Sequence, residues 1–165
     1  MSKRNLFINP SQGEVDQPLL IEELVGFMES EPDCRYRLVI GTDSKTALLS
    51  GKKPVDFVTA VVIHRLGRGG RYFWQRQRKQ KIASLRDKIY TEALLSIQMA
   101  EKIVPEFKQK LNGRSCQVEI HIDVGTVGET RDMIKEVVGM VTGNGYLAKT
   151  KPASFGATSV ADRHT

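Results

Sequence analysis

The chain has 165 residues, of which 40% are hydrophobic and 27% are charged, and its formal net charge is +6. This size and composition predict one globular domain with a substantial core. The positive charge favours a polyanionic partner, such as a nucleic acid, and argues against a basic one.

The cysteines and the hydropathy pattern exclude several classes of protein. Cys34 and Cys116 have no partner pattern, which excludes a zinc ribbon and a disulfide scaffold, and we expect both thiols to be inert. Asn9 and Pro10 interrupt the N-terminal apolar residues before a signal-peptide core could form. No apolar run approaches the roughly 20 residues of a membrane helix, so we expect a cytoplasmic protein without membrane contact.

The N-terminal half predicts an arm, a helix and a meander. Residues 1–17 predict an irregular arm with a turn at residues 9–13. A helix is expected from Pro18 to about Ser30, where apolar residues recur at helical spacing. Strands are expected over residues 36–42, 57–64 and 71–77. Short connections, the second of them a glycine-rich hairpin, predict an antiparallel meander.

The C-terminal half alternates helices and strands. We expect a helix over residues 85–104, ended by Pro105, a strand over 117–124, a helix over 130–142 with Thr130 as N-cap, a strand over 146–150, and one or two helical turns after residue 154. Strand–helix–strand connections are expected to be parallel and right-handed. The order therefore predicts an α/β fold with a mixed five-stranded sheet, an antiparallel meander plus parallel strands, flanked by helices. Residues 1–35 would form an arm and helix packed on the core of 36–165.

Two acids follow strand-like segments. Asp43 comes after residues 36–42, and Asp123 closes the run 118–122. The carboxyl ends of parallel strands are where open α/β sheets bind ligands, so these two carboxylates are expected to converge. The alternative is that each acid only forms a turn or caps a helix.

Two further acids are candidates for the same site. Glu92 lies at the edge of the apolar arc of its helix, whereas Asp87 falls on the polar side. Glu92 therefore points toward the sheet, unless it is a border residue that reaches water or pairs with Arg86 or Lys88. Asp162, in the C-terminal segment, indicates little by itself.

A cluster of carboxylates has a specific chemical meaning. Neighbouring carboxylates without a counter-ion repel one another and raise one another's pKa. Divalent cations such as Mg²⁺, which prefer oxygen ligands, reduce this repulsion. Two such ions can activate a water and stabilise the leaving oxygen of a phosphodiester. His64, His121 and His164 lack the spacing of a zinc site. We expect His121 to be a structural strand residue, and His164, beside Asp162, is a candidate proton shuttle.

The segment 65–81 is rich in arginine and lysine, contains no acid, and includes three consecutive aromatic residues. Cations bind phosphates and exposed aromatic rings stack on bases. The candidate nucleic-acid-binding residues are Arg68, Arg71, Trp74, Arg76, Arg78, Lys79 and Lys81. The alternative is that the aromatic rings pack the sheet and the charges form a solvated edge.

The order of these acids along the chain resembles that of the ribonuclease-H-like superfamily, and the segments that carry the resemblance are residues 40–44, 90–93, 120–123 and 161–163. That fold has a three-strand meander, a helix and parallel strands, with acids on the first strand, first helix, fourth strand and C-terminal helix. The resemblance runs from about residue 36 to the end. More narrowly, the chain resembles the uncharacterised bacterial YkuK-type group, a resemblance that extends to residues 9–11.

The resemblance implies a site and an activity. Asp43 and Asp123 would share two Mg²⁺ or Mn²⁺ ions, Glu92 would ligate one ion and Asp162 the other, with Ser44 and His164 as accessory residues. The implied activity is hydrolysis of phosphodiester bonds in RNA, RNA–DNA hybrid or DNA.

Two alternatives remain open at this point. One is a non-catalytic nucleic-acid-binding module with the same fold, for which removing the clustered acids should relieve repulsion and stabilise the protein. The other is a nucleotide- or phosphate-binding protein of the actin and sugar-kinase type, suggested by the glycine-containing segment 125–130 before a helix.

Overall fold

The computed structural model describes residues 5–44, 54–79, 82–125, 131–151 and 156–165, apart from the side chains of residues 156, 158, 159 and 162. In chain order the elements are β1 (Phe7–Asn9), β2 (Gly13–Val15), α1 (Gln17–Ser30), β3 (Tyr36–Ser44), β4 (Val55–Arg65), β5 (Gly70–Lys79), α2 (Leu85–Lys110), β6 (Gln117–His121), the 3₁₀ turn η1 (Arg131–Met133), α3 (Ile134–Gly143), β7 (Leu147–Lys149) and α4 (Gly156–Arg163). None of the described helices is long and apolar enough to cross a membrane. The N-cap expected at Thr130 lies outside the described residues.

A mixed sheet organises the fold, as predicted. Strands β3, β4 and β5 form the antiparallel meander, β6 pairs with β3 in parallel, and β7 pairs with β6 in parallel. The strand order is β2-β1-β5-β4-β3-β6-β7, so the described residues form a sheet of seven strands and the prediction of five is wrong.

The two additional strands come from the arm, which was expected to be irregular. β1 and β2 form a short hairpin, and Ile8 of β1 pairs with Trp74 of β5. Phe7 and Val15 are each 2% exposed, so burial of their side chains in the core favours the hairpin. The Asn9 side chain accepts hydrogen bonds from backbone N–H groups in the turn. Strands of three residues give too few alternations for a sequence pattern to reveal them.

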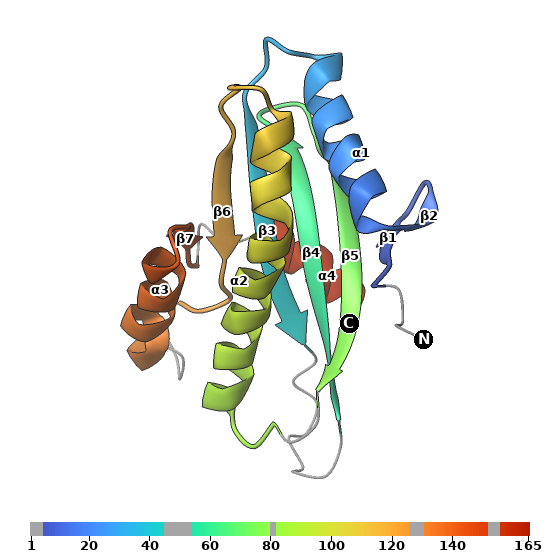
Figure 1. Ribbon diagram of the computed structural model, residues 1–165. Helices are drawn as coiled ribbons and strands as arrows, with labels where there is room; N and C mark the ends of the chain where they lie inside the picture. The colour runs from blue at the N-terminus through green and yellow to red at the C-terminus, as the bar shows by residue number, and fades with distance from the viewer. Residues whose placement is uncertain (1–4, 45–53, 80–81, 126–130, 152–155) are drawn as a thin grey trace.

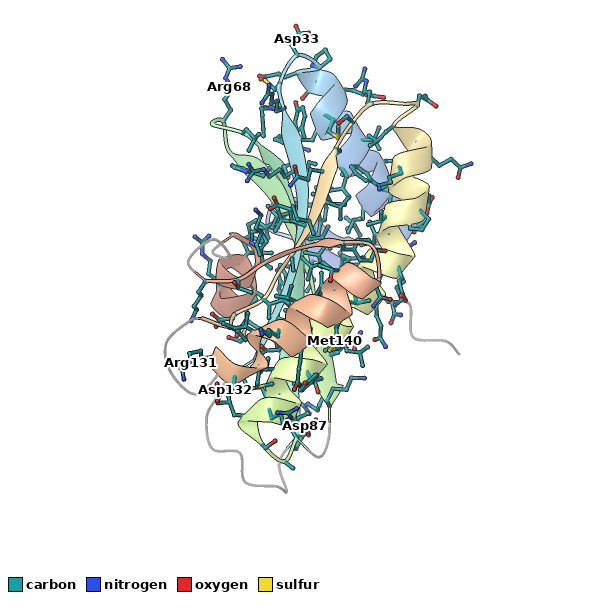
Figure 2. The ribbon with its side chains drawn as sticks, turned by 90° about the vertical axis from the view of Figure 1, so that its left-hand side faces the viewer. Asp33, Arg68, Asp87, Arg131, Asp132 and Met140 are labelled. Atoms are coloured by element: carbon teal, nitrogen blue, oxygen red, sulfur yellow. The ribbon has the colours of Figure 1, made fainter. Side chains whose placement is uncertain are left out.

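Helices cover the two faces of the sheet unequally. Helices α1, α2 and α3 lie on one face and α4 lies on the other, behind the sheet in Figure 1. The larger core packs residues such as Leu24, Ile40 and Ile103 between the sheet and α1–α3, and side chains fill this space in Figure 2. On the opposite face, Ala157 and Ala161 of α4 pack against β3 and β4. Small residues allow α4 to lie close to the strands.

Helix α2 continues through Pro105 to Lys110, so the prediction that it ends at this proline is wrong. Proline inside a helix removes one hydrogen bond and costs about 3 kcal/mol. Phe107 and Leu111, beyond the proline, are 0% and 3% exposed. Their burial in the core offsets this cost and keeps the chain helical.

Candidate functional site

Strand β3 carries Asp43 and Ser44 on opposite faces of the sheet. Side chains alternate along a strand. Val39 packs in the cluster under α4, whereas Ile40 packs in the core under α2. Asp43, which is 8% exposed, therefore lies on the α4 face and Ser44 on the α2 face. The strand was expected to end at Thr42, but it extends through Ser44, so Asp43 is paired opposite Val58 instead of following the strand.

Glu92 of α2 is buried at the end of β3. It is 3% exposed, and its Oε1 accepts a hydrogen bond of 2.8 Å from the Ser44 hydroxyl. The Nζ of Lys88, one helical turn earlier, lies 3.0 Å from the same oxygen. The orientation toward the sheet and the pairing with Lys88 therefore occur together. Arg86, the other expected partner, pairs with Glu136 instead.

Asp123 lies just beyond β6, which ends at His121 and is shorter than the expected strand 117–124. Its Oδ1 is 2.6 Å from the Nζ of Lys151. The chain around Lys151 is held in place because the Ile122 amide donates to the Lys149 carbonyl and the Lys151 amide donates to the Val124 carbonyl. The parallel β6–β7 pairing thus brings a lysine to the Asp123 carboxylate.

The charges of Asp123 and Asp43 affect neighbouring ionisable groups at the carboxyl ends of β3 and β6. Burial raises the pKa of Glu92, and the charge of Asp123 raises it further, against the opposing effects of Lys88 and Ser44. The hydrogen bond and charge of Asp123 raise the pKa of Lys151, and the charge of Asp43 adds to this. The charge of Asp123 thus reaches Glu92 and the charge of Asp43 reaches Lys151, with Lys88 and Lys151 as the counter-ions of Glu92 and Asp123.

Asp162 lies in α4, on the Asp43 face of the sheet, and its side chain is outside the description. The C-terminal helix expected from residue 154 is present over Gly156–Arg163. It contacts β3 and β4 through Ala157 and Ala161, which are both fully buried. These contacts hold the backbone of α4 against the strand that carries Asp43.

The donor chemistry fits a hard divalent cation. Carboxylate oxygens, with the Ser44 hydroxyl nearby, are the ligand type that Mg²⁺ and Mn²⁺ select. Among the described side chains, however, no three of the His, Cys, Asp and Glu type stand close enough together to hold a metal ion. Lys88 is paired with Glu92 and Lys151 with Asp123, so a metal ion can bind these acids only if a lysine ammonium group moves away from its carboxylate.

In the described part of the basic segment, residues 65–79, several arginines are paired with acids of the protein. Arg68 pairs with Glu31 at 2.9 Å, Arg71 with Glu23 at 2.8 Å, and Arg78 with Asp56 at 2.9 Å. The side chain of Lys79 is exposed, and Lys81 lies outside the described residues. Three of the candidate phosphate-binding residues thus have acidic partners within the protein.

Trp74 and Arg76 are arranged differently. They alternate with the core residue Phe73 and so lie on the α4 face of β5. The ring of His164 stacks on Trp74, and the Arg76 guanidinium donates to the His164 carbonyl at 2.5 Å. His164 therefore lies over β5, where it contacts an aromatic ring.

A buried polar cluster on β6 was not expected from the sequence. Glu119 is 1% exposed, and its carboxylate binds the His121 Nε2 at 3.0 Å and the Gln117 side-chain amide at 3.0 Å. Burial lowers the pKa of His121, which favours its neutral form. His121 is a strand residue, as predicted, but its partner Glu119 was missed because strand alternation shows only that the two side chains share a face.

Comparisons with known proteins agree with this architecture. The family model described as ribonuclease H-like matches residues 20–165. The chain is 32% identical over 175 aligned residues to the "Uncharacterized protein YkuK" of Bacillus subtilis (strain 168), covering 100% of this chain and 99% of the relative. No solved structure gives a significant match. The mixed sheet, the match over residues 20–165 and the full-length similarity together show that the chain belongs to the ribonuclease H-like family and is of the YkuK type.

Proposed function

We propose that the protein is a divalent-metal-dependent nuclease that hydrolyses phosphodiester bonds of RNA, RNA–DNA hybrid or DNA. The observation that supports this most strongly is that Asp43 and Asp123 lie at the carboxyl ends of β3 and β6, while Glu92 is hydrogen-bonded to Ser44 at the end of β3. Burying a carboxylate such as Glu92 is unfavourable unless a cation compensates it. The family to which the chain belongs supports the same type of chemistry.

Four residues would hold the ions in this proposal. Asp43 and Asp123 would be shared ligands, Glu92 would bind one ion and Asp162 the other. Bound Mg²⁺ or Mn²⁺ would activate a water and neutralise charge on the phosphodiester. The protein contributes orientation, since Ser44 and Lys88 both bind the Oε1 of Glu92 and hold its carboxylate at the end of β3.

Cleavage assays with a paired control test the proposal. End-labelled single strands, duplexes and RNA–DNA hybrids are incubated with the protein in Mn²⁺ or in EDTA. We expect metal-dependent cleavage of one substrate class that Asp43→Asn abolishes. Asp33→Asn makes the same chemical change at an exposed position near Arg68, at the opposite end of the molecule from Asp87 (Figure 2), and should leave cleavage unchanged. Cleavage that persists in Asp43→Asn, or in EDTA, contradicts the proposal.

A second function is supported by the two lysines. Lys88 and Lys151 compensate the acids without any ion, which is what a non-catalytic nucleic-acid-binding module of this family would need. Retention of labelled strands by both wild type and Asp43→Asn, with no cleavage in Mn²⁺, would establish that function and exclude the nuclease.

A further inference from the structure

The ring of His164 lies flat on the ring of Trp74. The ring centroids are 4.4 Å apart and the planes differ by 12°. Two further residues of β5 contact His164: Arg76 donates to its carbonyl, and the Tyr72 hydroxyl lies 3.4 Å from its Nε2. Tyr72, Trp74 and Arg76 alternate along the strand, so they share one face of the sheet.

Trp74 offers a supported surface for stacking. It packs against the cluster of Val39, Val58, Ala60, Ala157 and Ala161 between the sheet and α4. This packing fixes the indole, while His164 belongs to the segment that follows α4.

The arrangement has the chemistry of a base-stacking site. A planar nitrogen heterocycle lies on the indole, and the Arg76 guanidinium lies 5.7 Å from the indole centroid. Single-stranded nucleic acids bind proteins through bases stacked on aromatic rings and phosphates held by nearby cations. Arg68, Arg71 and Arg78 are each paired with a carboxylate, whereas the guanidinium of Arg76, an exposed residue, donates to the backbone carbonyl of His164.

The strand register places this surface beside the acids. Arg76 is paired with Val58 of β4, and Val58 is paired with Asp43 of β3. Neighbouring strands are about 4.8 Å apart, so the backbones at Arg76 and Asp43 are separated by about 10 Å. A nucleic-acid strand that stacks a base on Trp74 would therefore lie close to the acids.

We propose that Trp74 is the stacking site for one base of a single-stranded nucleic acid, and that His164 occupies this site as an internal competitor which the base displaces. A single strand fits this site and a duplex does not, because the faces of paired bases in a duplex are already stacked on one another. This inference rests on the nucleic-acid substrate of the proposed function, and it does not depend on cleavage.

Trp74 is the chain's single tryptophan, so its fluorescence reports this site directly. The full-length protein is titrated in EDTA with a 20-nucleotide oligothymidine or oligoadenine strand and with the duplex of the two. We expect the single strands to change the Trp74 emission at saturation and the duplex to leave it unchanged. A single strand that binds, as measured by anisotropy of a labelled oligonucleotide, without changing the emission overturns the proposal.

Variants separate competition from a structural role. His164→Ala removes the competing ring and should tighten the dissociation constant for the single strand by about fivefold. Trp74→Phe, which keeps an aromatic ring in the cluster, should weaken it by about threefold, and Arg76→Gln should weaken it and lower the salt dependence by about one ion. Matched controls are Tyr90→Leu, at an aromatic residue of α2 whose ring centroid lies 5.2 Å from the Arg86 guanidinium, and Arg86→Gln, at an arginine whose charge is paired with Glu136. Both should leave the dissociation constant unchanged.

The outcomes distinguish this proposal from the nuclease. Unchanged or weakened binding by His164→Ala, in a variant that keeps the wild-type melting temperature, overturns the competitor role. Cleavage without a single-strand response of Trp74 overturns only the stacking site. A Trp74 response and tighter binding by His164→Ala, without cleavage in Mn²⁺, support the stacking site and overturn only the nuclease.

Discussion

The ammonium group of Lys88 lies 3.0 Å from the carboxylate of Glu92, and the two side chains are 7% and 4% exposed. This pair is separated from water on all but a small part of its surface, so each charge depends on the other for compensation. Removing one member of a buried ion pair is more destabilising than replacing both, because the remaining charge is left without a partner. The pair therefore has a structural role as well as its place at the candidate site.

We predict that Glu92→Gln lowers the free energy of unfolding by about 3 kcal/mol, and that Lys88→Met does the same. The double variant Lys88→Met/Glu92→Gln should come within about 1 kcal/mol of wild type, since no charge is then left unpaired. Urea unfolding followed by circular dichroism measures all three. A Glu92→Gln variant more stable than wild type would show that repulsion between the acids dominates. That is the result expected from the sequence for a non-catalytic binding module, before the contacts with the lysines are considered.

The ion pair between Lys151 and Asp123 leads to a prediction about metal binding. The Nζ of Lys151 is 2.6 Å from the Asp123 carboxylate, but the lysine side chain is 59% exposed, so the pair is only moderately strong. Lys151→Met removes an ammonium group that competes with a cation, and should tighten Mn²⁺ binding by about threefold. Calorimetric titration of Mn²⁺ into the protein measures this.

The control for Lys151→Met is Lys110→Met, which removes a lysine paired with the half-exposed Glu106 on α2. It lowers the net charge equally but lies at the far end of the helix from Glu92. Equal tightening in both variants would show that net charge, and not release of Asp123, controls Mn²⁺ affinity.

The sequence predicted the parts of the fold that depend on long regular patterns. The meander β3–β5, the parallel strand β6 and the position of Asp43 and Asp123 near the strand ends follow from alternating or continuous apolar runs. The continuation of α2 past Pro105 could not be predicted, because it depends on the tertiary burial of Phe107.

The contacts that set the charge of the site were harder to predict. Lys88 is four residues before Glu92, so helical spacing makes it a candidate partner. Lys151 reaches Asp123 only because β7 pairs with β6 in one particular register, in which Glu119 lies opposite Leu147. A short strand gives no sequence signal for such a register. Likewise, no local pattern indicates that His164 stacks on a residue of β5.

Burial raises the pKa of the Cys116 thiol to about 11. The folded protein therefore binds this proton more tightly than the unfolded chain does. Ionisation of the thiol does not change the free energy of unfolding below about pH 9, and it lowers that free energy as the pH rises from about 9 to about 11. In a Cys34→Ser variant, which keeps Cys116, we predict that the rate of alkylation by iodoacetamide is very low at pH 8 and rises until about pH 11. Mass spectrometry measures the rate. A plateau near pH 9 would contradict the prediction.

The cluster of Glu119 and His121 supports the strand that leads to Asp123. Glu119 accepts from the Gln117 side chain and is bound to His121, whose other ring nitrogen, Nδ1, is buried with no hydrogen-bond partner in the described structure. Glu119→Ala would leave both nitrogens of the buried ring without partners, and we predict a loss of about 2–3 kcal/mol in the free energy of unfolding.

Glu119→Gln should lower the free energy of unfolding by less than Glu119→Ala, because the Gln side-chain carbonyl can still accept from His121. Gln117→Ala, which alters the exposed member of the cluster, should have an effect below about 0.5 kcal/mol. Urea unfolding of the three variants decides between a hydrogen-bond role and a charge role for Glu119. If Glu119→Gln destabilises as much as Glu119→Ala, the negative charge beside Arg37, 3.9 Å away, is what the fold requires, and the hydrogen bond to His121 is secondary.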